Sequence, residues 1–164
     1  MLLENTKKLN IGPSDKDDLG PVINEKQLNN MLTAIEKASL DGANILCGGK
    51  KLTDNKHING FYIEPTFIDK VSPSAEISNC ELFGPIACLY KVKNYNEALA
   101  LANDSPYGLT GCIHTQNFDR ANHFIQNLQA GVAVVNAGTF GSEPHMPFGG
   151  VKKSGNGSRE PGTE

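Results

Sequence analysis

The sequence predicts an α/β fold: an open, mostly parallel twisted sheet with flanking helices. Between residues 86 and 136, strand-like apolar runs alternate with helical patterns in the order strand, helix, strand, helix, strand. Such an alternation is typical of parallel sheets, because two parallel strands need a long crossover that is usually a helix. In addition, residues 86–92 are apolar except for Lys91, a pattern typical of a strand covered on both faces.

A helix over residues 24–40 is the first strong element. Asn24 can cap its first turn, with Gln27 three residues later, and Gly42 can end it. The apolar residues at helical spacing are Leu28, Met31, Leu32, Ile35 and Ala38.

Two strand-like segments follow this helix. Residues 43–47 predict a short strand, and residues 61–68 have a β-type composition. Pro65 has no N–H to donate, so we expect the second segment to be an edge strand or an extended connection.

Two more helices begin at Asn94 and Asn117, and both asparagines are expected to act as N-caps. The first ends before Pro106, which disfavours helical geometry in the preceding residue. Strands are expected over 109–115 and 132–136. The buried stripe expected for the second helix consists of Phe118, Ala121, Phe124, Ile125 and Leu128.

The length of 164 residues fits one domain over 1–164, in which the Gly- and Pro-rich part, 137–164, is mostly loop. A hydrophobic fraction of 38% and a net charge of −3 fit a soluble globular protein with no nucleic-acid and no membrane partner. The spacing of the four cysteines matches no zinc or redox motif, so no metal site is expected. Cys88 and Cys112 are expected to be reduced, buried thiols, which favours a cytoplasmic location.

Glu81 and Phe83 stand directly before the bend that Gly84 and Pro85 introduce. One interpretation is a turn with an exposed Glu and a core Phe. The other is a binding site, in which the carboxylate accepts hydrogen bonds from two hydroxyls beside an aromatic face. A ribose diol next to a nicotinamide ring would use both groups.

A second motif stands near the C-terminus, where Val135 and Asn136 are followed by a loop and then by residues 147–155, Pro-Phe-Gly-Gly-Val-Lys-Lys-Ser-Gly. Together with Glu-Leu-Phe-Gly-Pro at 81–85, this sequence resembles the C-terminal part of NAD(P)-dependent aldehyde dehydrogenases. The resemblance implies NAD or NADP as the cofactor. It also implies that Glu81 binds the nicotinamide ribose and that Phe83 lies near the ring.

The same resemblance implies that Phe148 walls the aldehyde tunnel and that the loop 137–146 sets substrate preference. Phe140 is a weaker candidate for the tunnel. The alternative for Phe148 is an ordinary packing aromatic between two loops.

No segment resembles that family's nucleotide-binding domain, its catalytic thiol motif or its general-base glutamate. We therefore expect no catalytic residue in this chain, no tight binding of NAD or NADP, and no activity of the chain alone. The expected partners are the missing N-terminal part of the enzyme and, through exposed sheet edges, further copies of this chain. The alternative function is a non-catalytic interaction or complementing module.

Overall fold

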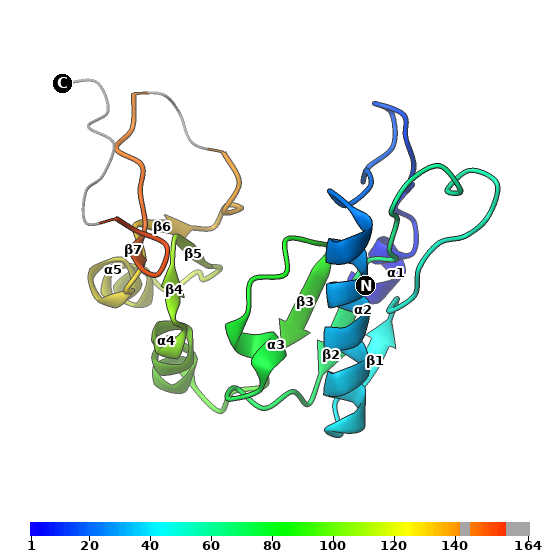
Figure 1. The fold of residues 1–164 in the computed structure, drawn as a ribbon. Helices are drawn as coiled ribbons and strands as arrows, with labels where there is room; N and C mark the ends of the chain where they lie inside the picture. Colours follow the sequence, from blue (N-terminus) through cyan, green and yellow to red (C-terminus); the bar gives the residue numbers. More distant parts are fainter. Residues whose placement is uncertain (142–144, 157–164) are drawn as a thin grey trace. The chain divides into compact units, whose positions relative to one another are not determined.

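The computed structural model describes residues 1–141 and 145–156. The chain divides into two compact units, Met1–Lys91 and Val92–Glu164 (Figure 1). Because two compact units can belong to one domain, the single domain over 1–164 stays a prediction.

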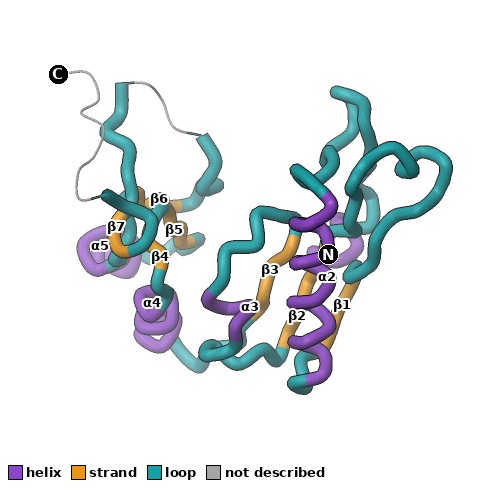
Figure 2. Tube along the Cα trace, in the orientation of Figure 1, coloured by secondary structure: helices purple, strands orange, loops and turns teal. Residues whose placement is uncertain are grey.

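The first unit contains a three-stranded sheet in the order β1-β2-β3 (Figures 1 and 2). Its strands are β1 (Asn44–Cys47), β2 (Thr66–Asp69) and β3 (Ile86–Leu89). β1 runs antiparallel to β2, and β2 runs parallel to β3. Residues 61–68 were expected to be an edge strand or an extended connection; the edge strand was wrong, because β2 is central and begins only after Pro65. Pro65 lies just before the strand, so its missing N–H removes no bond from the ladder.

Helix α2 (Glu25–Leu40) packs on this sheet and forms the core of the first unit. Asn24 caps it as predicted, since its side chain accepts a hydrogen bond from the backbone N–H of Gln27 at 2.8 Å. Leu28 and Met31 of α2 are fully buried together with Ile68 of β2. Each such side chain stabilises the unit by roughly 1.5–3 kcal/mol through removal of apolar surface from water.

Two shorter helices complete the first unit, α1 (Leu2–Thr6) and α3 (Glu76–Asn79). Helix α3 stands between β2 and β3 in the chain and is anchored by Ile77, which is buried. The segment from α3 to β3 therefore starts and ends on core elements.

The second unit contains two helices, α4 (Tyr95–Asp104) and α5 (Phe118–Asn127), and two small sheets. Asn94 and Asn117 cap the helices as predicted. One sheet pairs β5 (Thr110–Ile113) in parallel with β6 (Val132–Val135), joined by α5. The other pairs β4 (Tyr107–Gly108) antiparallel to β7 (Val151–Lys152), which lies within the segment expected to be mostly loop.

The α/β class is confirmed, and both β2–β3 and β5–β6 are parallel pairs. The described strands form three sheets rather than one open sheet, and two of the four strand pairs are antiparallel. The alternation of strands and helices predicts the crossovers. It does not predict which strands pair, because strand pairing depends on contacts between residues that are far apart in the sequence.

The buried stripe expected for α5 was wrong at two positions. Phe124 is 5% exposed, but Phe118 is 76% and Ile125 51% exposed. The sheet below α5 has only two strands, so it covers one narrow face of the helix. The expectation of buried thiols was also wrong for Cys112 of β5, which is exposed, while Cys88 of β3 is half-buried.

Within residues 1–141 and 145–156, no helix is long and apolar enough to cross a membrane. The same residues contain no group of three or more His, Cys, Asp and Glu side chains that could hold a metal ion.

Candidate functional site

The first candidate site is the loop that connects α3 to β3 and carries Glu81 and Phe83. It is held on both sides of these residues. The side-chain amide of Gln27 donates a hydrogen bond to the carbonyl oxygen of Leu82. After the loop, the backbone N–H of Thr66 donates to the carbonyl oxygen of Pro85 at 2.8 Å. A loop tied to α2 and to β2 holds its side chains on a rigid support.

The carboxylate of Glu81 is exposed and makes no hydrogen bond or ion pair with any other described residue. It lines a cavity of about 420 Å³. A free carboxylate has only acceptor oxygens, so this wall of the cavity favours a ligand that presents hydroxyl or N–H groups. The cavity is lined by Ile77, Ser78, Cys80, Glu81, Leu82, Phe83, Gly84, Ile86, Cys88 and Tyr90.

Phe83 lines the same cavity, and its backbone is in the left-handed region with φ +49°. Its side chain is 77% exposed, so the interpretation of Phe83 as a core residue was wrong. A left-handed conformation is unfavourable for a residue with a bulky side chain and persists only where the surrounding structure imposes it. The fold therefore holds an aromatic ring in solvent at a conformational cost, which is typical of a binding residue.

Cys88, which lies beside this loop, does not have the properties of a nucleophile. Tyr90 Oη donates to Ser78 Oγ at 2.6 Å beneath the loop, and Cys88 lies next to this pair. Burial raises the pKa of the Cys88 thiol, which keeps it protonated and unreactive. Cys80 is exposed, as is Cys112 in the second unit.

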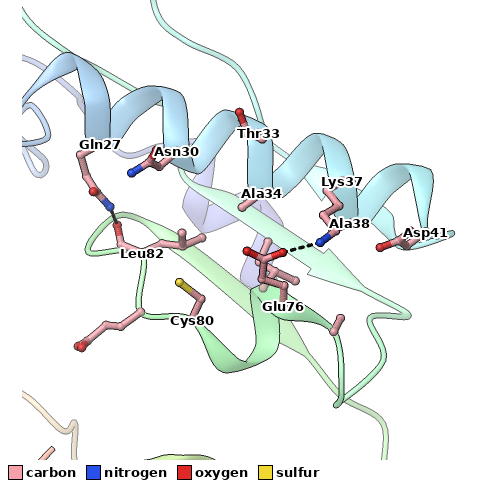
Figure 3. A pocket seen from close by; sticks show the side chains of 13 residues that line it. Gln27, Asn30, Thr33, Ala34, Lys37, Ala38, Asp41, Glu76, Cys80 and Leu82 are labelled. Carbon is pink, nitrogen blue, oxygen red and sulfur yellow. Dashed lines mark hydrogen bonds and ion pairs between the residues drawn. The ribbon is translucent and has the colours of Figure 1, made fainter. Parts of the chain in front are cut away.

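A second cavity, of about 350 Å³, lies between α2 and the segment from α3 to Leu82 (Figure 3). Lys37 Nζ and Glu76 Oε2 form an ion pair at 2.5 Å across it. This contact raises the pKa of Lys37 and lowers that of Glu76. Since Cys80, Glu81 and Leu82 line both cavities, the loop is the wall between them.

In the second unit, Asn136 ends β6 and starts the loop that carries Phe140 and Phe148. Its side-chain Nδ2 donates to the carbonyl of Thr115 at 2.9 Å, while Oδ1 accepts from the N–H of Thr115 at 2.8 Å. Its backbone is left-handed, with φ +56°, a conformation that Asn adopts more readily than most residues. Asn136, directly after β6, thus pairs through its side chain with Thr115, two residues after β5.

Phe140 is 89% exposed, and its ring lies against the backbone of Gly138, where any Cβ would overlap it. Phe148 is half-buried. The residue after it, Gly149, brings its carbonyl oxygen so close to Gly131 that a Cβ at Gly131 would overlap it. The Phe148 end of the loop is therefore held against the start of β6.

The structure brings Glu81 and Phe83 together in one loop and at one cavity. Phe140 and Phe148 share a loop of the second unit, and residues 142–144 and 157–164 of the predicted loop lie outside the described residues. The role of Gln27 is not apparent from the sequence. It occupies the position of a capping-box residue, but its side chain reaches Leu82, 55 residues away, and no local pattern signals that contact.

Comparison with known proteins matches residues 1–164 to the aldehyde dehydrogenase family. The chain is 43% identical over 163 residues to the alpha-ketoglutaric semialdehyde dehydrogenase of Bacillus subtilis (strain 168), covering 98% of this chain and 33% of that protein. It is 37% identical over 153 residues to the alpha-ketoglutarate semialdehyde dehydrogenase of Haloferax volcanii, with 93% and 32% covered. The chain thus spans about a third of the length of these relatives.

Among solved structures, the chain is similar to the betaine aldehyde dehydrogenase of Staphylococcus aureus in complex with NAD+. The TM-score is 0.90 at 31% identity, and the match covers 96% of this chain and 32% of the other.

Proposed function

This chain belongs to the aldehyde dehydrogenase family, and we propose that it supplies the nicotinamide-ribose and substrate-tunnel residues of an enzyme that oxidises an aldehyde or semialdehyde to the carboxylic acid with NAD or NADP. The observation that carries this proposal is the carboxylate of Glu81. It is exposed at a cavity beside Phe83 and makes no hydrogen bond or ion pair with another described residue.

The residues of this loop fit the ribose end of such a cofactor. Glu81 offers two acceptor oxygens, and a ribose diol offers two hydroxyl donors, so both hydrogen bonds would be charge-assisted. Phe83 presents an exposed ring at the same cavity. NAD or NADP supplies the hydride acceptor when bound. The contribution of this chain is to hold the ribose and orient the ring, which lowers the entropy cost of reaching the reactive geometry.

In the second unit, we assign Phe148 to the wall of the aldehyde tunnel and Phe140 to its more exposed part. Phe148 is half-buried and anchored through Gly149, whereas Phe140 is almost fully exposed. The similarity to two semialdehyde dehydrogenases supports a semialdehyde as the substrate class.

The chain by itself is proposed to be inactive and to bind NAD or NADP weakly. Oxidation of an aldehyde by this family needs a nucleophilic thiolate and an oxyanion site, and no cysteine here lies in the family's thiol motif. The partner that completes the site is the remaining part of the enzyme, which carries the nucleophile and the contacts to adenine and pyrophosphate. We also propose that isolated copies self-associate through apolar surface that is left exposed.

An activity assay tests the proposal in two stages. The purified chain, mixed with NAD or NADP and several aldehydes, is expected to give no formation of reduced cofactor above a heat-killed blank. The chain is then placed in the Bacillus subtilis relative, in exchange for the segment that it matches. That chimera is expected to oxidise a semialdehyde. Turnover by the chain alone, dependent on one of its cysteines, would refute its inactivity.

In the chimera, Glu81→Gln removes the charge of the proposed ribose ligand. Charge-assisted hydrogen bonds are worth about 1.5–3 kcal/mol, so the apparent affinity for cofactor or kcat/KM should fall roughly 10- to 150-fold. Glu25→Gln, an exposed acidic residue in the first turn of α2, is the matched control and should leave both unchanged. Equal behaviour of the two variants would return Glu81 to the role of a surface residue.

A further inference from the structure

Lys152 lies in the short strand β7, four residues after Phe148, and its side chain contacts residues that are 47 and 49 positions away in the sequence. Its Nζ donates hydrogen bonds to the carbonyl oxygens of Asn103 at 2.6 Å and Ser105 at 3.0 Å. Both acceptors belong to the C-terminal end of α4, which has no basic residue in its own last turn. The lysine therefore supplies, from 49 residues away, the positive charge and donors that helix C-termini favour.

The junction that Lys152 joins is already well connected. Asn103 donates through Nδ2 to the carbonyl of Asn127 at the end of α5, and its Oδ1 accepts from the N–H of Gln129 at 2.8 Å. The ends of both helices are thus tied together at Asn103. By binding this junction, Lys152 attaches β7 to the point where the ends of α4 and α5 are hydrogen-bonded to each other.

The ladder of strand β7 sets its register only weakly, although the N–H of Lys153 also donates to the carbonyl of Pro106 at 3.1 Å and the N–H of Gly108 to Ser154 Oγ at 3.2 Å. It consists of two residues, paired as Tyr107 with Lys152 and Gly108 with Val151. A shift by one residue would place alternate side chains on the opposite face, and so short a ladder resists such a shift weakly. Lys152 is also left-handed, with φ +53°, a conformation that a lysine keeps only where its surroundings impose it.

Phe148 lies just before this strand. Because Gly149 and Gly150 connect the two, the register of β7 also fixes the position of Phe148. The carbonyl oxygen of Gly149 touches Gly131, and the carbonyl oxygen of Gly150 touches Gly155. The approach of Gly149 to Gly131 leaves no room for a Cβ and joins this segment to the start of β6, so it holds only if the chain enters β7 at one position. A shift of Lys152 along the sheet would separate Gly149 from Gly131 and move Phe148.

We propose that Lys152 is a positioning residue: by binding the end of α4 it fixes the register of β7 and with it the place of Phe148. The proposal rests on the function proposed above, in which Phe148 walls the substrate tunnel. Lys152 does not reach the substrate itself. Lys152 affects substrate selection through the side chain of Phe148, whose place depends on the register of β7.

Fluorine NMR of the 164-residue chain, labelled with fluorophenylalanine, tests this without any assay of activity. The chain has seven Phe residues, and loss of a signal in Phe148→Leu assigns Phe148. Lys152→Met should shift or broaden that signal and should raise amide exchange at Val151 by about fivefold or more. Lys152→Arg, which keeps the charge and donors, should restore both. Lys153→Met is the matched control, since the Lys153 side chain makes no hydrogen bond or ion pair with a described residue.

An unchanged Phe148 signal in Lys152→Met, with increased exchange only at the end of α4, would overturn the proposal and leave Lys152 as a helix cap. Equal effects of the Lys152 and Lys153 variants would overturn it as well. If Lys152→Met does not fold, Lys152→Gln replaces it, because its neutral amide keeps a donor and much of the stem. Since the readout needs neither aldehyde nor cofactor, a negative result leaves the proposed function to its own assay.

Discussion

The side-chain amide of Gln27 donates a hydrogen bond to the carbonyl oxygen of Leu82, which stands between Glu81 and Phe83. This bond joins α2 to the middle of the candidate cofactor loop, and it is visible in Figure 3. Its partners are 55 residues apart in the chain. The position of both candidate ligands therefore depends on a residue outside the motif.

We predict that Gln27→Met loosens this loop while α2 stays folded. The hydrogen bond is worth about 0.5–1.5 kcal/mol, so amide exchange over residues 80–84 should rise about 2- to 10-fold. Methionine keeps the length of the side chain and favours helix, which isolates the loss of the bond. Asn30→Ala, an exposed position on the same helix, should leave the exchange unchanged. Equal exchange in Gln27→Met and wild type would show that the loop is held by other contacts.

The conformation of Phe83 predicts that its substitution does not destabilise the first unit. Phe83→Gly removes the cost of a left-handed backbone, about 1–2 kcal/mol, and adds about 0.5–1 kcal/mol of chain entropy in the unfolded state. The 77% exposed ring contributes little burial. Unfolding in urea should therefore give a free energy equal to wild type or up to about 1.5 kcal/mol higher.

Ile68→Ala is the control for that measurement, because Ile68 is fully buried. It should lower the free energy of unfolding by about 2–5 kcal/mol. A loss of similar size in Phe83→Gly would mean that the ring packs against the unit rather than serving a ligand.

His57 is 7% exposed and has an acceptor at each ring nitrogen. Nδ1 lies 2.7 Å from Asp54 Oδ2, and Nε2 lies 2.9 Å from the carbonyl oxygen of Ile11. Both contacts are hydrogen bonds only when both nitrogens carry protons. The bond to Ile11 and then that to Asp54 raise the pKa of His57 above its ordinary value of 6.5, against burial and the charge of Lys56. Lys56 is itself paired with Asp17 at 2.7 Å.

The stability of the first unit should therefore fall as the pH rises past 6.5 and through the raised pKa of His57. Because the folded pKa of His57 is raised, its contribution is fully present below pH 6.5 and is lost as the pH passes through the folded pKa. The pKa of Asp54 is lowered by the same contact, so its contribution is present above 3.8 and is lost at still lower pH. Urea unfolding across pH 5–9 measures this, and His57→Gln should flatten the change. His114→Gln, exposed in the second unit, should keep the wild-type profile. A flat profile in the wild type would contradict the prediction.

The contact between Gly131 and Gly149 predicts that Gly131→Ala strongly destabilises the second unit. A Cβ there would overlap a backbone oxygen, and forced overlap costs about 1–3 kcal/mol or more. Gly141→Ala is the control, since Gly141 has φ +90° and open space around it. It should cost only the backbone strain of about 1–2 kcal/mol, reduced by the lower entropy of the unfolded chain. Urea unfolding followed through signals of α5 compares the two. Equal losses would show that the loop moves aside freely.

Self-association should depend on the exposed face of α5. Phe118 and Ile125 lie two turns apart on one side of the helix and are 76% and 51% exposed. Light scattering behind a sizing column should show masses above the monomer at high concentration. The double variant Phe118→Lys and Ile125→Lys should need about tenfold more protein to associate, an effect of about 1.4 kcal/mol. Gln126→Lys, exposed on the same helix, should behave like wild type. A monomer mass at every concentration would refute the prediction.

Local features of the sequence predicted the elements well. Asn24, Asn94 and Asn117 were all expected to cap helices, and each accepts a bond from the backbone N–H three residues later. Such bonds are decided within one turn, so the sequence around them is sufficient. The pair Glu81 and Phe83 was likewise named from adjacent residues, and the structure places both at one cavity.

Only the tertiary structure decided which side chains are covered and what holds the loops. The exposure of Phe118 follows from the two-stranded sheet beneath α5, and the central place of β2 follows from its neighbours on both sides. Gln27 and Lys152 find backbone acceptors 55 and 49 residues away. Periodicity and capping report on bonds within a few residues. Contacts between distant segments depend on how whole elements pack. The sequence by itself therefore determined the helices, their caps and the candidate residues, whereas the packing decided which of these residues are exposed and what holds them in place.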